Sequence, residues 1–184
     1  VRGVGKLANS GTSWERFRNQ FSRLAGDRET ERAGRAAASA VIPHGEAPDK
    51  SKVEFVVIGL GRFGTSVART LLTYGYNVLA IDSDMARVQE LSTSLPHVLQ
   101  LDATNVDALR QAGVESFDTG LVCIGTDFES NVLATVLLRR LGVRRVITKA
   151  RTRTQKEILL RVGADEVILP EHEAGVRLAR KLAA

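Results

Sequence analysis

The stretch Val-Glu-Phe-Val-Val-Ile-Gly-Leu-Gly-Arg-Phe-Gly, residues 53–64, decides the fold of this chain. Its apolar run ends at Gly59, and Gly61 and Gly64 follow ahead of an amphipathic segment. This spacing is typical of a turn between a buried strand and a helix. Gly59 permits the tight turn, Gly61 lets the backbone approach a phosphate, and Gly64 lets the helix lie close on the strand. The free N–H groups and the dipole at the helix start favour an anion there.

A second apolar run ends in an acid, Asp82, eighteen residues beyond Gly64. A carboxylate at this distance is placed to accept hydrogen bonds from ribose hydroxyls. Asp82 is followed by Ser83, with no arginine beside it, which argues against a 2′-phosphate on the ribose. The glycines and the acid together predict nucleotide binding, with a purely structural turn as the alternative. They do not distinguish adenosine nucleotides from NAD(H), because both ligands need the same groups.

Composition sets limits on the class of protein. The 184 residues are 43% hydrophobic, enough for one domain with a core plus an appendage. No apolar run approaches the roughly 20 residues that cross a bilayer, and no secretory signal is visible. The single cysteine, Cys123, cannot form an internal disulfide, which favours an intracellular location, and we expect it to be a small buried hydrophobe. The net charge of +5 is too small to indicate nucleic-acid binding by itself.

Residues 1–50 form an extension separate from the rest of the chain. Apolar residues at spacings of three and four, with arginines between them, predict a short basic amphipathic helix. These apolar residues are Trp14, Phe17, Phe21 and Leu24. Such a helix could lie on a membrane surface or dock on a partner, and it could equally pack on its own domain or belong to a poorly ordered tail. Residues 26–50 have the composition of a linker.

From residue 53 onward, apolar runs alternate with amphipathic segments. The predicted strands are 53–58, 77–81, 97–101, 119–124, 144–149 and 166–169. The predicted helices are 62–74, 84–94, 105–112, 128–141, 153–163 and 171 to the end. Expected N-caps are Asp84, Asn105 and Asp127, and expected helix stops are Gly75, Gly113, Gly142 and Gly163. This α/β pattern predicts a Rossmann-like, doubly wound six-stranded parallel sheet in the order 3-2-1-4-5-6.

In such a sheet, ligands bind beyond the carboxyl ends of the strands, at the switch between the first and fourth strands. The residues at these ends are the predicted nucleotide-binding set: Gly59, Leu60, Gly61, Arg62, Phe63, Gly64, Asp82, Ser83, Asp102, Ala103, Thr104, Ile124, Gly125, Thr126 and Lys149. The guanidinium of Arg62 could reach terminal phosphate oxygens. Asp102 and Thr104 could bond to an adenine edge or a ribose, or could cap the helix at 105–112. Lys149 could meet a phosphate, or be a solvated strand end.

The chain resembles RCK domains, also called KTN or TrkA-N domains, over residues 53–184. The resemblance rests on a combination of motifs: Gly-Leu-Gly-Arg-Phe-Gly at 59–64, Leu-Ala-Ile-Asp at 79–82, Asp-Ala-Thr at 102–104, Gly-Ala-Asp at 163–165, Leu-Pro-Glu at 169–171 and the Gly175-Val176 pair. It is strongest to the cytosolic regulatory subunits of Ktr- and Trk-type potassium uptake systems. Residues 51–184 would form the nucleotide-binding N-terminal domain of such a subunit.

The resemblance implies a non-enzymatic sensor of ATP or ADP, with NAD(H) as the alternative ligand. Such subunits form dimers that assemble into rings on the inner face of the cell membrane, where they gate a membrane-embedded potassium translocating subunit. By motif match, Arg62 contacts the terminal phosphates and Asp82 the ribose, and Glu171 helps to hold Mg²⁺ or Ca²⁺ at the dimer interface. The last helix would cross to the neighbouring subunit. Family members continue into a smaller C-terminal subdomain, which we expect to be absent after Ala184.

Two alternatives belong to other functional classes. An NAD-dependent oxidoreductase needs a domain for its substrate, and the sheet already uses residues 53–184. A Tyr-x-x-x-Lys pair is missing as well, and the three histidines, His44, His97 and His172, offer no general base. An NADH redox sensor that acts on nucleic acid would need more than the basic stretch at 139–153, which lacks interleaved aromatic residues. We therefore expect neither enzymatic activity nor a nucleic-acid partner.

Overall fold

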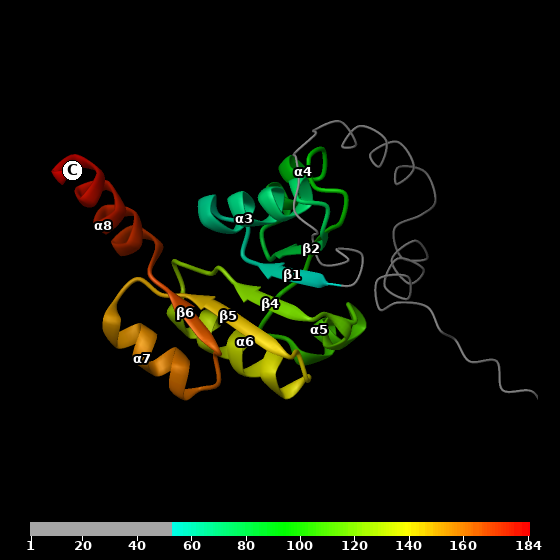
Figure 1. The fold of residues 1–184 in the computed structure, drawn as a ribbon. Helices are drawn as coiled ribbons and strands as arrows, with labels where there is room; N and C mark the ends of the chain where they lie inside the picture. Colours follow the sequence, from blue (N-terminus) through cyan, green and yellow to red (C-terminus); the bar gives the residue numbers. More distant parts are fainter. Residues whose placement is uncertain (1–52) are drawn as a thin grey trace, which may run out of the picture.

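The computed structural model describes residues 53–184 of the chain (Figure 1). The amphipathic helix and linker predicted in residues 1–50 lie outside these described residues. Within them, six strands form one sheet in the order β3-β2-β1-β4-β5-β6. Every neighbouring pair of strands runs parallel. The predicted Rossmann-like, doubly wound parallel sheet is therefore confirmed.

Strands and helices alternate along the chain as the apolar pattern predicts. The strands are β1 (Glu54–Ile58), β2 (Asn77–Asp82), β3 (Val98–Gln100), β4 (Thr119–Val122), β5 (Arg145–Lys149) and β6 (Glu166–Ile168). The helices are α3 (Arg62–Thr73), α4 (Met85–Leu91), α5 (Val106–Gln111), α6 (Phe128–Arg140), α7 (Arg153–Arg161) and α8 (Pro170–Ala183). Most bounds agree with expectation to within one residue. The larger differences are in α4, which stops at Leu91 instead of 94, and in β4 and α7, which stop at Val122 and Arg161 instead of 124 and 163. A short 3-10 helix, η2 (Val114–Ser116), was not predicted.

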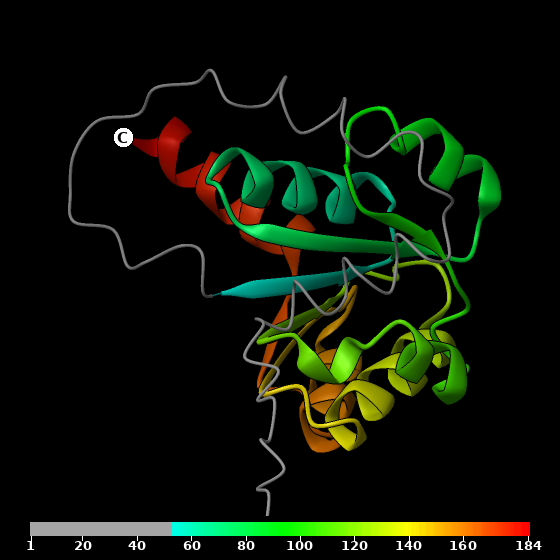
Figure 2. The ribbon, with the colours of Figure 1, turned by 90° about the vertical axis from the view of Figure 1, so that its right-hand side faces the viewer.

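Both faces of the sheet are covered, because successive residues of the central strands point to opposite sides. Val57 packs in one cluster with Ala68 of α3 and Leu91 of α4. Val56 and Ile58 pack in the opposite cluster, with residues of α5 and α6. Figures 1 and 2 show α3 and α4 on one side of the sheet and α5, α6 and α7 on the other. The two apolar clusters hold the strand ends, and hence the loops between strand and helix, in fixed positions.

The helix ends follow the predicted capping. The side chains of Asp84, Asn105 and Asp127 accept hydrogen bonds from N–H groups at the starts of α4, α5 and α6. Thr152 does the same for α7 and was not predicted. The glycines expected to stop helices all have positive φ angles: Gly75, Gly113, Gly142 and Gly163. Local sequence therefore sets the boundaries of these elements.

The last helix, α8, leads away from the sheet beyond β6 (Figure 1). None of its residues is buried, and Val176, Leu178 and Leu182 expose apolar side chains to solvent. Its apolar side chains therefore contribute little to the core of the described domain. Within residues 53–184, no helix combines the length and the apolar character that a membrane crossing requires.

Candidate nucleotide-binding site

The loop after β1 has the geometry that its glycines predict. Gly59 has φ of 93°, and its N–H donates to the carbonyl of Ile81 at 2.8 Å. A Cβ on Gly59 would lie 2.9 Å from the backbone nitrogen of Ile124, so the loop is packed tightly against the chain beyond β4. A Cβ on Gly64 would lie 1.9 Å from the carbonyl oxygen of Gly59. Gly59 therefore makes the turn, and Gly64 brings α3 onto the strand, as expected.

Gly61 borders open space at the start of α3. Gly61 is the N-cap residue, with φ of −67°, and no side chain caps this helix. A Cβ placed on Gly61 would meet no other atom within 4 Å. By contrast, α4, α5, α6 and α7 each begin with a side chain that accepts from their first turn. The N–H groups in the first turn of α3 are thus left without a side-chain acceptor, in an arrangement that suits a phosphate.

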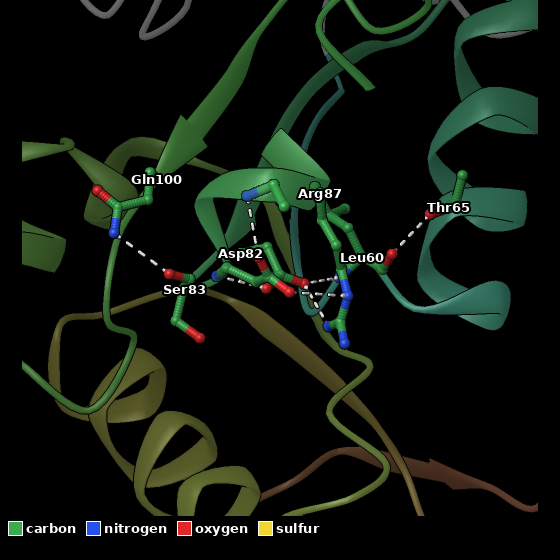
Figure 3. A network of polar contacts seen from close by, with 8 residues as sticks. Leu60, Thr65, Asp82, Ser83, Arg87 and Gln100 are labelled. Atoms are coloured by element: carbon green, nitrogen blue, oxygen red, sulfur yellow. Dashed lines mark hydrogen bonds and ion pairs between the residues drawn. The ribbon is translucent and has the colours of Figure 1, made fainter. Parts of the chain in front are cut away.

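Asp82 is the last residue of β2, and its carboxylate is held against the glycine loop (Figure 3). Its Oδ2 accepts from the N–H of Leu60 at 2.6 Å, and its Oδ1 accepts from the N–H of Asp84 at 2.9 Å. The side chain is only 5% exposed. Two backbone groups therefore fix the carboxylate next to the first turn of α3, the place where the sequence puts a ribose acceptor.

Arg87 was not predicted as part of this site. It lies on the first turn of α4, and its Nη1 is 3.3 Å from Oδ2 of Asp82 (Figure 3). Its Nε lies 3.6 Å from Oδ2 of Asp84. The predicted N-cap at Asp84 could have revealed Arg87, because side chains three positions apart at a helix are neighbours and Arg87 is three residues beyond Asp84. The argument against a 2′-phosphate considered only the position next to Asp82, and Arg87 approaches the same carboxylate from five residues beyond it.

The predicted residues after β3 bond to one another. Oδ1 of Asp102 accepts from both the N–H and the hydroxyl of Thr104, at 2.9 and 2.7 Å. Asn105, and neither of these two residues, caps α5, so the capping alternative is wrong. Ala103 is buried in the core. The backbone carbonyl of Ser83 accepts from Gln100 at 3.2 Å, which ties the ends of β2 and β3 together.

Lys149, at the end of β5, joins three parts of the site. Its Nζ lies 5.8 Å from the centre of the Phe63 ring on α3, and 3.5 Å from a Cβ built on Gly125. It also donates to Oε1 of Glu171 on α8 at 2.8 Å. The side chain is only 13% exposed, so the solvated-end alternative is wrong. The ammonium sits where the loops after β1, β4 and β5 meet.

Asn131 on α6 is a second residue that the sequence did not reveal. Its Nδ2 donates to the carbonyls of Ile124 and Lys149, at 2.7 and 3.1 Å. Its Oδ1 accepts from the hydroxyl of Thr148 at 2.8 Å, and its side chain is 1% exposed. One buried amide thus fixes the backbone beyond β4 and β5. Its only signal was a polar residue on the apolar side of a predicted helix.

Arg62 and Thr126 complete the predicted set and are both exposed. Within residues 53–184, the guanidinium of Arg62 makes no hydrogen bond or ion pair. Arg62 is the first residue of α3, so its side chain starts beside the open N–H groups. A long cationic side chain without other partners in this part of the chain could contact an anion bound at the start of α3.

Cys123 is buried as predicted, directly behind the loop. Burial raises the pKa of its thiol to about 12, against a smaller lowering effect of Lys149. The thiol is therefore neutral at physiological pH, and it fills space next to Gly64, whose added Cβ would lie 3.1 Å from that of Cys123. This position serves packing.

Glu171 is the predicted metal ligand, and its carboxylate is paired with Lys149. The hydrogen bond from Lys149 holds the pKa of this carboxyl below its usual value. Within residues 53–184, no group of three or more His, Cys, Asp or Glu side chains is arranged to hold a metal ion. A divalent cation held by Glu171 would therefore need further oxygens, from phosphate or from a second chain.

The profile of the TrkA-N domain family matches residues 55–170. The chain belongs to the TrkA-N domain family. This TrkA-N domain is similar to Ktr system potassium uptake protein A of Vibrio alginolyticus, with 36% identity over 129 residues, covering 70% of the chain and 59% of that relative. It is also similar to Ktr system potassium uptake protein C of Bacillus subtilis, with 35% identity over 131 residues, covering 71% and 59%. The chain therefore spans about three-fifths of the length of these relatives.

Solved structures share the fold of this TrkA-N domain. The TrkA-N domain of the inner membrane protein ybaL from Escherichia coli has a TM-score of 0.64 at 19% identity, covering 70% of this chain and 96% of that one. The C-terminal domain of Kef from Shewanella denitrificans, in an AMP-bound form, has a TM-score of 0.60 at 22% identity, covering 71% and 82%. The GsuK channel bound to NAD has a TM-score of 0.57 at 15% identity, covering 66% and 22%. At these identities the likeness concerns the fold alone.

Proposed function

We propose that this chain is the nucleotide-sensing domain of a regulatory subunit of a potassium uptake system, and that it binds ATP or ADP at the loop between β1 and α3. The observation that carries the proposal is the joint placement of the uncapped first turn of α3 and the buried carboxylate of Asp82. This placement supports binding of a nucleotide, with N–H donors for a phosphate beside a carboxylate that could accept from ribose hydroxyls. The relatives named as Ktr potassium uptake proteins supply the physiological context.

Related folds support an adenosine nucleotide as the ligand. Chains of this fold are described with bound AMP, ADP and NAD, which share an adenosine carrying a 5′-phosphate. Within this chain, the free guanidinium of Arg62 at the start of α3 favours ATP or ADP over NAD(H), because it can contact a terminal phosphate that NAD lacks. Calorimetric titration with ATP, ADP, NAD⁺ and NADH tests this order. Binding of NADH alone would favour the redox-sensor alternative.

The nucleotide would act by shifting the population of two conformations. Lys149 bridges the nucleotide loop and Glu171, which lies in the first turn of α8. A terminal phosphate near Lys149 would compete for its ammonium and release the carboxylate of Glu171, which could then help to hold Mg²⁺ or Ca²⁺ beside the phosphates. The nucleotide can shift the equilibrium between the two conformations, which would differ in the position of α8, only by the difference in its binding free energy for them.

We also propose partners for this chain, which are a second copy of itself and a membrane subunit that transports potassium. The chain would form a homodimer through its last helix and assemble into a ring beneath a membrane-embedded potassium translocating subunit, at the cytoplasmic face of the membrane. The exposed apolar residues of α8 support a contact with another chain. The longer relatives support a role within a larger subunit, of which residues 51–184 would form the nucleotide-binding domain.

No bond is made or broken in this proposal. The carboxylate of Asp82 is engaged by backbone N–H groups, and the thiol of Cys123 is buried with a pKa of about 12. His97 immediately precedes β3, at the amino edge of the sheet, opposite the candidate site. The groups that the proposal uses at the carboxyl edge therefore serve binding.

Replacement of Arg62 by alanine should reduce discrimination between ATP and ADP. Loss of a charge-assisted contact to the terminal phosphate should narrow the ratio of their affinities by about tenfold. Calorimetry with both nucleotides measures the ratio. Arg161→Ala removes an equal charge at the far end of α7 and should leave the ratio unchanged. An unaltered ratio in Arg62→Ala would remove Arg62 from its assigned role.

Replacement of Glu171 by glutamine should abolish the dependence of ATP affinity on Mg²⁺ or Ca²⁺. The neutral amide keeps the shape of the side chain but loses the charge that attracts a hard cation. Titration of ATP with the cation and with a chelator gives the difference. Glu173→Gln, a neutralisation in the same turn of α8, is the matched control. Equal cation dependence in both variants would mean that Glu171 is not a ligand.

A further inference from the structure

Arg87 is a charged residue that neither the fold nor the proposed function requires. Its Nη1 lies 3.3 Å from Oδ2 of Asp82, and its side chain is 51% exposed while that of Asp82 is 5% exposed. The Leu60 N–H shares the same oxygen at a shorter distance of 2.6 Å. The guanidinium is therefore the outer and weaker of the two partners of Oδ2, on the side open to solvent.

An incoming ribose must use the remaining acceptor capacity of Asp82. A carboxylate offers about four lone-pair positions, and the N–H groups of Leu60 and Asp84 occupy one on each oxygen. These backbone contacts belong to the loop and to the start of α4, so they persist when a ligand binds. The contact from Arg87 is long, half exposed and carried by a flexible side chain. A ribose hydroxyl would displace it, and the guanidinium would then stand beside the ribose edge.

We propose that Arg87 determines specificity at the 2′ position of the bound nucleotide, so that the site accepts a 2′-phosphate as well as a 2′-hydroxyl. This inference rests on the proposed nucleotide binding and adds a ligand class, adenosine nucleotides that carry a 2′-phosphate. Asp82 alone would repel such a phosphate. Arg87 supplies the opposite charge and a planar fork of donors suited to phosphate oxygens.

The carboxylate of Asp84 also faces Arg87, and it weakens the attraction of Arg87 for a 2′-phosphate without removing it. Nε of Arg87 faces Oδ2 of Asp84 at 3.6 Å, and that side chain is 46% exposed. Because Asp84 accepts from the N–H of Ala86 through its other oxygen, Oδ1, it remains a cap of α4 in either case. The structure thus places one cation against two carboxylates. A 2′-phosphate is accepted beside a 2′-hydroxyl, and it is not preferred.

Two adenosine ligands that differ only at the 2′ position test this inference. Calorimetry on the purified chain would compare 5′-AMP with adenosine 2′,5′-bisphosphate, for the wild type and for Arg87→Ala and Arg87→Lys. Arg87→Ala should weaken binding of the bisphosphate about tenfold and change the affinity for 5′-AMP less than threefold. Arg87→Lys should recover part of the loss, because it keeps the charge without the fork.

The outcomes separate the inference from the function on which it rests. If the wild type binds 5′-AMP and not the bisphosphate, the specificity role is overturned and nucleotide binding stands. If Arg87→Ala weakens both ligands equally, Arg87 merely supports Asp82 and the inference is again overturned. If neither ligand binds the wild type, both the proposed nucleotide binding and the inference about Arg87 are overturned. Urea unfolding of Arg87→Ala shows whether the variant is folded, and a loss confined to the bisphosphate cannot arise from unfolding.

Discussion

Gly64→Ala is expected to unfold at a much lower urea concentration than the wild type, with a loss of more than about 3 kcal/mol in the free energy of unfolding. The new Cβ would lie 1.9 Å from the carbonyl oxygen of Gly59. The backbone fixes the position of the Cβ, and the oxygen is a backbone atom, so no side-chain rotation relieves the clash and α3 must move away from β1. A domain with a typical stability of about 5–15 kcal/mol would lose a large part of it. Circular dichroism during urea titration measures the loss.

Gly61→Ala is the matched control, because it adds the same methyl group three residues earlier in the same loop. Its Cβ meets nothing within 4 Å, so the cost should stay near or below 1 kcal/mol, the usual difference between glycine and alanine at an N-cap. The methyl would instead occupy the space over the first turn of α3, and nucleotide affinity should fall. Equal unfolding midpoints for the two variants would contradict the role of Gly64.

Asp82→Ala should have the largest effect on nucleotide binding, a loss of about 100-fold in affinity for ADP. A carboxylate that accepts from ribose hydroxyls contributes about 1.5–3 kcal/mol for each such hydrogen bond. The change also leaves the N–H groups of Leu60 and Asp84 without their acceptor, which should cost about 1–3 kcal/mol of stability. Calorimetry below the unfolding transition measures affinity separately from stability.

Asp84→Ala provides the comparison for this second prediction. Asp84 is an exposed carboxylate two residues away, and it caps α4 through the N–H of Ala86. Its removal should cost about 1 kcal/mol of stability and leave the affinity for ADP within about threefold. If Asp84→Ala weakens ADP binding as much as Asp82→Ala, the effect arises from general electrostatics and the assignment of Asp82 to the ribose is wrong.

Most of the fold could be predicted because the signals for it are local. The apolar runs give the strands, and residues such as Asp127 and Gly142 mark where helices begin and end through contacts within a few positions. The glycine loop was predictable for the same reason: Gly59 and Gly64 act on each other over five residues. The handedness of parallel crossovers then limits the strand orders to a few, and the order 3-2-1-4-5-6 is that of the doubly wound sheet.

The parts of the site that the sequence did not reveal depend on side chains from separate elements. Asn131 acts through carbonyls that lie seven and eighteen residues away in the chain. The pairing of Lys149 with Glu171 spans 22 residues and requires α8 to begin directly beside the end of β5. Spacing rules for helices and strands contain no information about such contacts, since the contacts appear only when the sheet brings the strand ends to one edge.

The buried amide of Asn131 has a mechanical consequence. It joins the main chain beyond β4 and β5 to α6, so these two neighbouring segments cannot spread apart without breaking hydrogen bonds in a nearly dry environment. In the proposed mechanism, a signal that starts at the glycine loop would therefore reach α8 through the contacts of Lys149 with Phe63 and Glu171. The segments held by Asn131 would stay fixed while the side chain of Lys149 moves.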